Sequence, residues 1–170
     1  MADTHDDDRR QRFGQLVQQH QDAVLRTCFL YLRDRTLAGD ASQETFLRAW
    51  RAMDTFRSES SEKTWLMKIA MHVCCDMNRS AWLRKINRRV TPEMLPEPAA
   101  DATGSDEELT MAVMHLPRRL REAVVLYYYQ GMTVVEIADV LNISHAAVSG
   151  RLKRGRNRLK MMMKGCEQDA

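Results

Sequence analysis

The sequence predicts an all-α protein with two small helical domains joined by a flexible linker. Apolar residues recur at helical spacing along most of the chain, and no alternating run is long enough to predict a strand. The stretch TPEMLPEPAADATGSDEE contains three prolines, shows little periodicity and has six acidic residues within 92–108, which is typical of a linker. We therefore expect domains at 9–88 and 107–164, separated by a linker at 89–106.

Three helices are expected in the N-terminal domain. The first carries an apolar stripe that runs from Phe13 to Tyr31. The second should begin at Asp40, because an aspartate followed three residues later by Gln43 resembles a capping box. A polar segment at 56–63 predicts a loop, and a third helix with an apolar stripe and a basic outer face should follow it.

The C-terminal domain should contain four short helices. Gly131 suits the end of one helix, and Thr133 with Glu136 forms a capping-box pattern at the start of the next. The three tyrosines at 127–129 are expected to pack in the core, since a tyrosine ring buries a large apolar area.

The last helix is heavily basic, because residues 144–164 contain seven Lys or Arg and no acid. On a helical wheel its apolar face holds Val148, Leu152, Gly155 and Leu159, and the opposite face holds Ser149, Gly150, Lys153, Arg154, Asn157 and Lys160. Such a helix can pack on its neighbour with one face and enter a DNA major groove with the other. Lys153 and Arg154 can donate to guanine, whereas flanking arginines can hold phosphates. An ordinary helix with a solvated basic face is the alternative.

The composition disfavours several classes of protein. The net charge is only +3, and no apolar run reaches the roughly 18 residues that a membrane helix needs, so no stable membrane insertion is expected. The N-terminus lacks the apolar segment of a secretory signal, and the four cysteines form no CxxC pair; we expect a cytoplasmic protein with no metal and no cofactor. The five histidines are scattered and no catalytic motif accompanies them, so an enzyme is not expected.

Three segments of the chain resemble one protein family. They are DASQETFLRAW at 40–50, TWLMKIAMHVCCDMNR at 64–79 and LPRRLREAVVLYYYQGMTVVEIADVLNISHAAVSGRLKRGRNRL at 116–159. Their sequence and order are similar to the extracytoplasmic-function sigma factors of the bacterial sigma-70 family. The resemblance implies a sigma region 2 helical bundle followed by a sigma region 4 helix-turn-helix domain. It also implies a protein that binds core RNA polymerase, directs it to promoters by reading minus-35 and minus-10 elements, and initiates transcription.

The resemblance also implies three groups of functional residues. Those implied to dock on the clamp helices of the largest polymerase subunits are Asp40, Gln43, Glu44, Arg48 and Trp50. Those implied to hold a flipped base and the displaced strand of the minus-10 element are Phe56, Arg57, Ser58, Ser60, Lys63, Lys68, His72 and Arg79. Those implied to read the minus-35 element are Ser144, His145, Ala147, Ser149, Gly150, Arg151, Lys153, Arg154, Arg156 and Arg158. Phe46 and Trp65 are expected to be core residues.

The implied partners are core RNA polymerase, through its clamp helices and beta flap, promoter DNA, and an anti-sigma factor that could hold the protein at the membrane. Two tethered DNA-binding domains reinforce each other only when the tether lets both engage. We expect the free protein to bind promoter DNA weakly, because the linker leaves the spacing of its domains undefined until core polymerase sets it. A free-standing helix-turn-helix regulator is the alternative, because such proteins share the pattern at 133–160.

Overall fold

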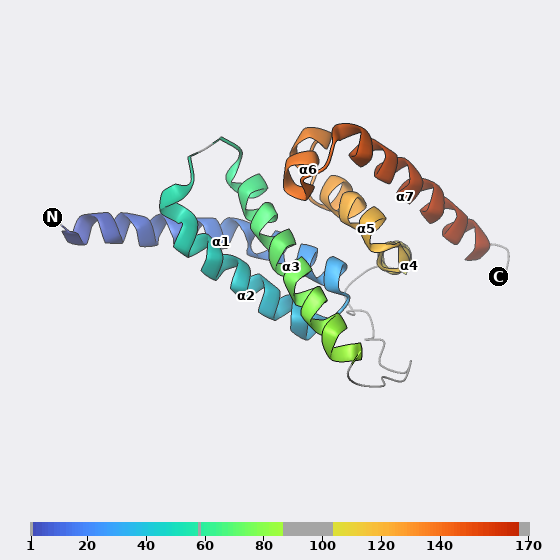
Figure 1. The fold of residues 1–170 in the computed structure, drawn as a ribbon, viewed down its shortest axis with the longest axis horizontal. Helices are drawn as coiled ribbons and strands as arrows, with labels where there is room; N and C mark the ends of the chain where they lie inside the picture. The colour runs from blue at the N-terminus through green and yellow to red at the C-terminus, as the bar shows by residue number, and fades with distance from the viewer. Residues whose placement is uncertain (1, 58, 87–103, 167–170) are drawn as a thin grey trace.

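The computed structural model describes residues 2–57, 59–86 and 104–166, and the regular elements there are all helical. The N-terminal domain consists of α1 (Ala2–Leu32), α2 (Arg35–Ala52) and α3 (Glu62–Ile86). The C-terminal domain consists of α4 (Gly104–His115), α5 (Arg118–Val124), α6 (Val134–Leu141) and α7 (His145–Cys166). Figure 1 shows α1 to α3 packed side by side, with α4 to α7 grouped beside them. The prediction of an all-α protein with two helical domains is confirmed.

The bounds of several helices differ from the predicted bounds, and α3 begins at Glu62, inside the predicted loop at 56–63. Most of the predicted linker, 87–103, lies outside the described residues, but its last part, 104–106, belongs to α4. The prediction of four short helices is wrong for α7, which has 22 residues. None of the helices in the described part of the chain has the length and hydrophobicity needed to cross a bilayer, and no group of three or more potential metal ligands occurs there.

The connection between α1 and α2 is shorter than the sequence pattern predicts. Arg33 has a positive φ of 57°, which turns the chain sharply at the end of α1. The Asp34 carboxylate then accepts a hydrogen bond of 2.8 Å from the Leu37 N–H, so Asp34 is the N-cap of α2. The predicted start at Asp40 is wrong, because the cap has already been provided and Asp40 lies inside α2.

The turn signals of the C-terminal domain are confirmed. Gly131 has a φ of +64°, a conformation that favours glycine, and it follows the helical stretch that begins with α5. Thr133 caps α6 and forms the predicted reciprocal capping box with Glu136. Asn142 is left-handed, with a φ of 51°, and donates its N–H to the Asp139 carbonyl. This residue lets α6 and α7 meet across a tight turn.

A π-helical turn, Val125–Tyr129, extends α5 and decides where the tyrosines point. Tyr127 and Tyr128 are 37% and 51% exposed, so the prediction that all three tyrosines pack in the core is wrong. Consecutive residues of a helix point in different directions, and here Val125 and Leu126 take the buried positions.

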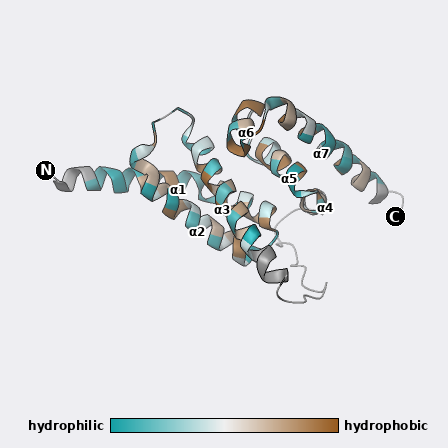
Figure 2. Cartoon of the chain, viewed as in Figure 1, coloured by the Kyte–Doolittle hydropathy of each residue, from teal (hydrophilic) through white to brown (hydrophobic). Residues whose placement is uncertain are grey.

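The two domains share one apolar core. Val24 of α1 and Leu66 of α3 are buried in the same cluster as Leu126 and Ile137 of the C-terminal domain. Burial of apolar surface is the main favourable term in folding, so this cluster holds the domains against each other. Figure 2 shows hydrophobic residues on α5 and α6, and a largely hydrophilic outer side along α7. The arrangement differs from the expectation that the linker leaves the spacing of the domains undefined.

Arg121 joins the domains through a buried charge. Its side chain is 5% exposed, and its guanidinium donates to the carbonyls of Tyr31 at 3.0 Å, Met114 at 2.8 Å and Leu116 at 3.1 Å. Tyr31 and Met114 lie in the last turns of α1 and α4, where carbonyl groups carry partial negative charge that compensates the cation. Burial nevertheless lowers the pKa of Arg121 to about 10.

Gly155 marks a close approach between α7 and α5. A Cβ atom added to Gly155 would lie 2.7 Å from Cγ2 of the buried Val124. We expect Gly155→Ala to lower the free energy of unfolding by about 1 to 3 kcal/mol, because overpacking outweighs the gain in helix propensity. Gly39→Ala is the control, because an added methyl group there meets open space and should raise stability by up to about 1 kcal/mol. Chemical denaturation measures both, and a stabilising Gly155→Ala would contradict this packing.

Candidate nucleic-acid and protein interfaces

The basic face of α7 is presented by a helix-turn-helix. The Ser144 hydroxyl caps α7 by accepting a hydrogen bond of 3.1 Å from the Ala147 N–H. Val148 and Leu152 are 0% and 4% exposed, which confirms the predicted core face of the helix. The opposite, exposed face carries Ser149, Lys153, Arg154, Asn157 and Lys160.

The predicted minus-35 residues fall into two groups by their surroundings. Ser144, His145, Ser149, Lys153, Arg154, Arg156 and Arg158 are exposed, whereas Ala147, Gly150 and Arg151 are partly covered. Arg151 points to α5, where its guanidinium lies 3.3 Å from the Glu122 carboxylate. No carboxylate in the described residues lies within ion-pair distance of Lys153 or Arg154, so their charges are available to an external anion.

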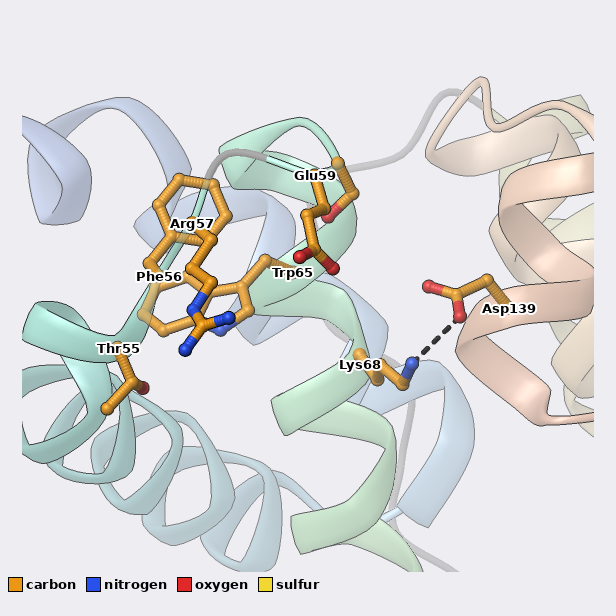
Figure 3. Close-up of a pocket in the computed structure, with 8 residues that line it drawn as sticks. Thr55, Phe56, Arg57, Glu59, Trp65, Lys68 and Asp139 are labelled. Atoms are coloured by element: carbon orange, nitrogen blue, oxygen red, sulfur yellow. Dashed lines mark hydrogen bonds and ion pairs between the residues drawn. The ribbon is translucent and has the colours of Figure 1, made fainter.

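A polar cavity of about 360 Å³ lies where the segment after α2 meets α3 (Figure 3). It is lined by Thr55, Phe56, Arg57, Glu59, Ser60, Trp65, Lys68 and Asp139. The rings of Phe56 and Trp65 lie 4.9 Å apart with their planes tilted by 37°. Trp65 also packs against the core, as predicted, so its ring contacts the core and lines the cavity. Aromatic rings beside cationic groups suit an unstacked base and its phosphate.

The predicted minus-10 lysines contact the C-terminal domain. Lys68 Nζ lies 2.8 Å from a carboxylate oxygen of Asp139 on α6, as the dashed line in Figure 3 marks. Lys63 Nζ donates a hydrogen bond to the carbonyl of Gln130. Of the remaining predicted residues, Arg57, His72 and Arg79 are exposed, Phe56 and Ser60 are partly covered, and Ser58 lies outside the described residues.

An apolar groove runs between α1 and α2. It is lined by Arg10, Phe13, Gly14, Val17, Gln43, Phe46, Leu47 and Trp50. The rings of Trp50 and Phe46 pack edge-on against Phe13, with centroids 5.0 Å and 6.4 Å away. Leu47 beside them is 51% exposed. Apolar surface that stays open in this way is typical of a protein-docking site.

Only part of the predicted polymerase-docking set lines this groove. Gln43 and Trp50 line it, whereas Glu44 and Arg48 form an ion pair of 2.7 Å on another side of α2. Arg48 also reaches Asp76 of α3 at 3.2 Å, and its hydrogen bonds to Glu44 and Asp76 raise the pKa of its guanidinium despite partial burial. This pair therefore joins α2 to α3.

The predicted docking residues do not include Leu47, which lines the groove. Asp40, which they do include, is exposed on α2 but does not line the groove. The neighbouring Phe46 and Leu47 offered a usable signal, because two adjacent residues of a helix point about 100° apart and cannot both face the middle of one core.

Glu136 connects the two domains from the start of α6. One carboxylate oxygen accepts a hydrogen bond from the Thr64 hydroxyl of α3 at 2.9 Å, and the other accepts the Thr133 N–H at 2.8 Å. The Thr133 N–H, followed by the hydroxyls of Thr133 and Thr64, lowers the pKa of Glu136 below its ordinary value of 4.5. The carboxylate is therefore ionised at neutral pH.

We expect Glu136→Gln to lower the free energy of unfolding by about 1 kcal/mol near pH 7, because charge-assisted hydrogen bonds become neutral ones. The folded-state pKa is depressed, so the contribution of the carboxylate is complete above the unfolded-state pKa and is lost as the pH falls through the folded-state pKa. The difference between wild type and variant should therefore shrink below pH 4.5. Denaturation across this pH range measures it, and a difference that does not change with pH would contradict the assignment.

A basic helix-turn-helix coupled to a second helical domain is the architecture of a DNA-binding transcription protein. Comparison with known proteins identifies the family of this transcription protein.

Residues 16–86 match the family model Sigma-70 region 2, and residues 106–159 match the model Sigma-70, region 4. The chain is 35% identical over 132 residues to the ECF RNA polymerase sigma factor SigC of Mycobacterium tuberculosis, which covers 76% of this chain and 71% of that relative. It is 26% identical over 166 residues to the ECF RNA polymerase sigma factor SigW of Bacillus subtilis, covering 89% of each.

Solved structures share this fold. The sigma factor RpoE of Bartonella quintana, in complex with the anti-sigma factor NepR, matches with a TM-score of 0.80 and 22% identity, covering 90% of this chain and 97% of that one. CnrH, in complex with the cytosolic domain of CnrY, matches with a TM-score of 0.68 and 27% identity, covering 92% and 90%. The chain therefore belongs to the extracytoplasmic-function sigma factors of the sigma-70 family. It is a DNA-binding subunit of RNA polymerase and not an enzyme, and the alternative of a free-standing regulator is not favoured.

Proposed function

We propose that this sigma factor docks on core polymerase through the α1–α2 groove, reads the minus-35 element with α7, and binds the minus-10 element with α3 and the segment before it. The domain at 107–164 thus reads one promoter element, and the domain at 9–88 binds the other and the polymerase. The observation that carries the proposal is the exposed basic face of α7, on a helix whose other face is buried.

Base readout is assigned to the exposed centre of α7. Lys153 and Arg154 can donate to guanine O6 and N7 in the major groove, and Ser149 can reach a neighbouring base edge. A Cβ atom at Gly150 would make only ordinary contact with Arg154, 3.6 Å from its Nη1, so Gly150 lies beside this guanidinium without being required for its position. Arg156 and Arg158 are assigned to phosphates, which set the position of the helix. Arg151, paired with Glu122, orients α7 on α5.

The proposal is tested by run-off transcription with core polymerase on a promoter library. On a promoter that depends on this protein, Arg154→Ala should lower minus-35-dependent transcription by about 5- to 150-fold, since a bidentate base contact contributes about 1 to 3 kcal/mol of discrimination. Binding to core polymerase should not change.

Arg158→Ala is the matched control, because loss of a phosphate contact weakens binding to all sequences alike. Identical losses for the two variants on every promoter sequence would contradict the assignment of Arg154 to base readout. A library without a dependent promoter would contradict the proposed function.

Binding of the minus-10 element is assigned to the cavity beside Trp65. The Phe56 ring offers a stacking surface for a base that has left the duplex, and Arg57 lies at the same cavity. Arg79, further along α3, is exposed and suits the backbone of the displaced strand. Ser60, His72 and the two lysines complete the proposed surface.

Docking on the clamp helices is assigned to the α1–α2 groove. Trp50 and Leu47 supply apolar surface, and the Gln43 amide supplies hydrogen bonding at its edge. Aromatic side chains are enriched at protein interfaces, and an apolar groove is the usual receptor for one face of a helix.

Leu47→Ala should weaken the binding of core polymerase by about five- to tenfold, since truncation of a central interface residue costs about 1 kcal/mol or more. Leu25→Ala is the matched control, because Leu25 is 45% exposed, close to the 51% of Leu47, but does not line the groove. Biolayer interferometry with immobilised core polymerase measures both affinities. Equal weakening by the two substitutions would contradict this docking site.

A second apolar patch is assigned to the beta flap. It lies between α5 and the C-terminal half of α7, where Leu120, Met161 and Met162 supply apolar surface, with Met161 75% exposed, and Arg154, Asn157 and Arg158 line its edge toward the DNA-reading face. Methionine side chains adapt their shape to a partner, which suits a transient contact.

We also propose that the protein acts in the cytoplasm and is held inactive by an anti-sigma factor. Support comes from two proteins of similar fold: the sigma factor RpoE forms a complex with the anti-sigma factor NepR, and CnrH forms one with the cytosolic domain of CnrY. An anti-sigma factor would prevent transcription by covering the α1–α2 groove or the face of α7.

A further inference from the structure

The start of α3 is occupied by the C-terminal domain. Thr64 donates its hydroxyl to Glu136 at 2.9 Å, and Lys68 forms its ion pair of 2.8 Å with Asp139. Lys63 donates to the carbonyl of Gln130 just before α6. These three contacts use the stretch of α3 that the proposed function assigns to the minus-10 element.

Buried contacts lie beneath this polar layer. The Gln130 amide donates to the Thr27 hydroxyl at 2.8 Å and to the Ala23 carbonyl at 3.2 Å, both on α1. Arg121 reaches the Tyr31 carbonyl, and Ile137 of α6 is fully buried in the shared core. Buried polar groups lose their hydrogen bonds if the domains shift against each other. Their pairing therefore favours one arrangement of the two domains.

The position of Asp139 is chemically specific. Its carboxylate reaches from α6 to the cavity that Phe56 and Trp65 line, and it neutralises Lys68 there (Figure 3). A carboxylate on a lysine beside two aromatic rings has the charge and the placement of a DNA phosphate next to a stacked base. Asp139 already neutralises Lys68, and its negative charge repels an incoming phosphate, so Asp139 and a DNA phosphate compete for this lysine.

We propose that α6 inhibits the free protein from within by standing in for the minus-10 strand, with Asp139 in the place of a phosphate and Glu136 supporting it. This inference rests on the proposed function, since it needs α3 to be the minus-10 surface. The domains must separate before the strand can bind, so the apparent affinity falls in proportion to the open fraction. The expected weak DNA binding of the free protein then arises from a closed arrangement instead of an undefined spacing.

The closed contact can be detected directly with a zero-length carbodiimide reagent, which joins an amine and a carboxylate that touch. Applied to the full chain, it should yield a Lys68–Asp139 cross-linked peptide in mass spectrometry. A saturating single-stranded oligonucleotide that carries the non-template minus-10 sequence of a dependent promoter should suppress this peptide. Absence of the peptide, or a yield that the bound oligonucleotide does not change, would overturn the proposal.

Two substitutions test the consequence for affinity. Asp139→Asn should tighten binding of the same oligonucleotide by the full chain by about two- to fivefold, the usual worth of an exposed ion pair. Glu136→Gln combined with Asp139→Asn should tighten binding of the oligonucleotide by about tenfold. The capping of α6 should survive, because the glutamine side chain still accepts the hydrogen bond from the Thr133 N–H. Asp22→Asn is the control, because it removes the same charge from the exposed surface of α1. An Asp139→Asn affinity equal to that of wild type or to that of the control would overturn the proposal.

Run-off transcription separates this proposal from the proposed function. A saturating concentration of core polymerase should separate the two domains in both the wild type and Asp139→Asn. Both proteins should therefore reach the same transcript yield. If both transcribe but the oligonucleotide affinities do not differ, only the internal inhibition is wrong. If neither transcribes with core polymerase, the proposed function is wrong and the inference falls with it.

Discussion

The packing of α5 and α6 onto α1 and α3 determines how the two domains meet and which surfaces stay exposed. It merges what would be two small cores into one, and burial of more apolar surface per residue is what stabilises short helical domains. Most of the polar groups in this interface are paired: the Nη1 and Nη2 atoms of Arg121 donate to carbonyls, while its Nε has no partner, and the Gln130 amide donates to Thr27. Such pairing limits the interface to a single register.

That packing also sets the direction of each charged surface. α7 must turn its apolar side to α5 and α6, so its basic side faces outward, where DNA can reach it. α6, which precedes α7 across the tight turn, directs Glu136 and Asp139 toward α3. One small domain therefore presents cations to promoter DNA and anions to its neighbour. The same contacts that hold the domains together cover the start of α3, the surface proposed to bind the minus-10 strand.

The sequence predicted local features well where a single periodicity or cap was at work. The buried face of α7 and the capping box of Thr133 depend only on residues within one or two helical turns. The prediction was wrong where two local signals competed. Asp34 provided the cap before Asp40 could, and a π-helical turn exposed Tyr127 and Tyr128. For the candidate site, Trp50 was predictable as an aromatic on an amphipathic helix, whereas Leu47 was not selected because its exposure depends on how α1 lies beside α2.

Short-range periodicity, turn chemistry and the quoted motifs were enough to predict the all-α class, the two helical domains, the helix-turn-helix and the family. The charges on α6 and α7 could also be read directly. Which of those charges meet depends on the tertiary packing. Lys68 and Asp139 are 71 residues apart, and no local pattern reports a pairing over that distance. Their contact exists because the shared core brings α6 onto α3, so this ion pair is a property of the packing.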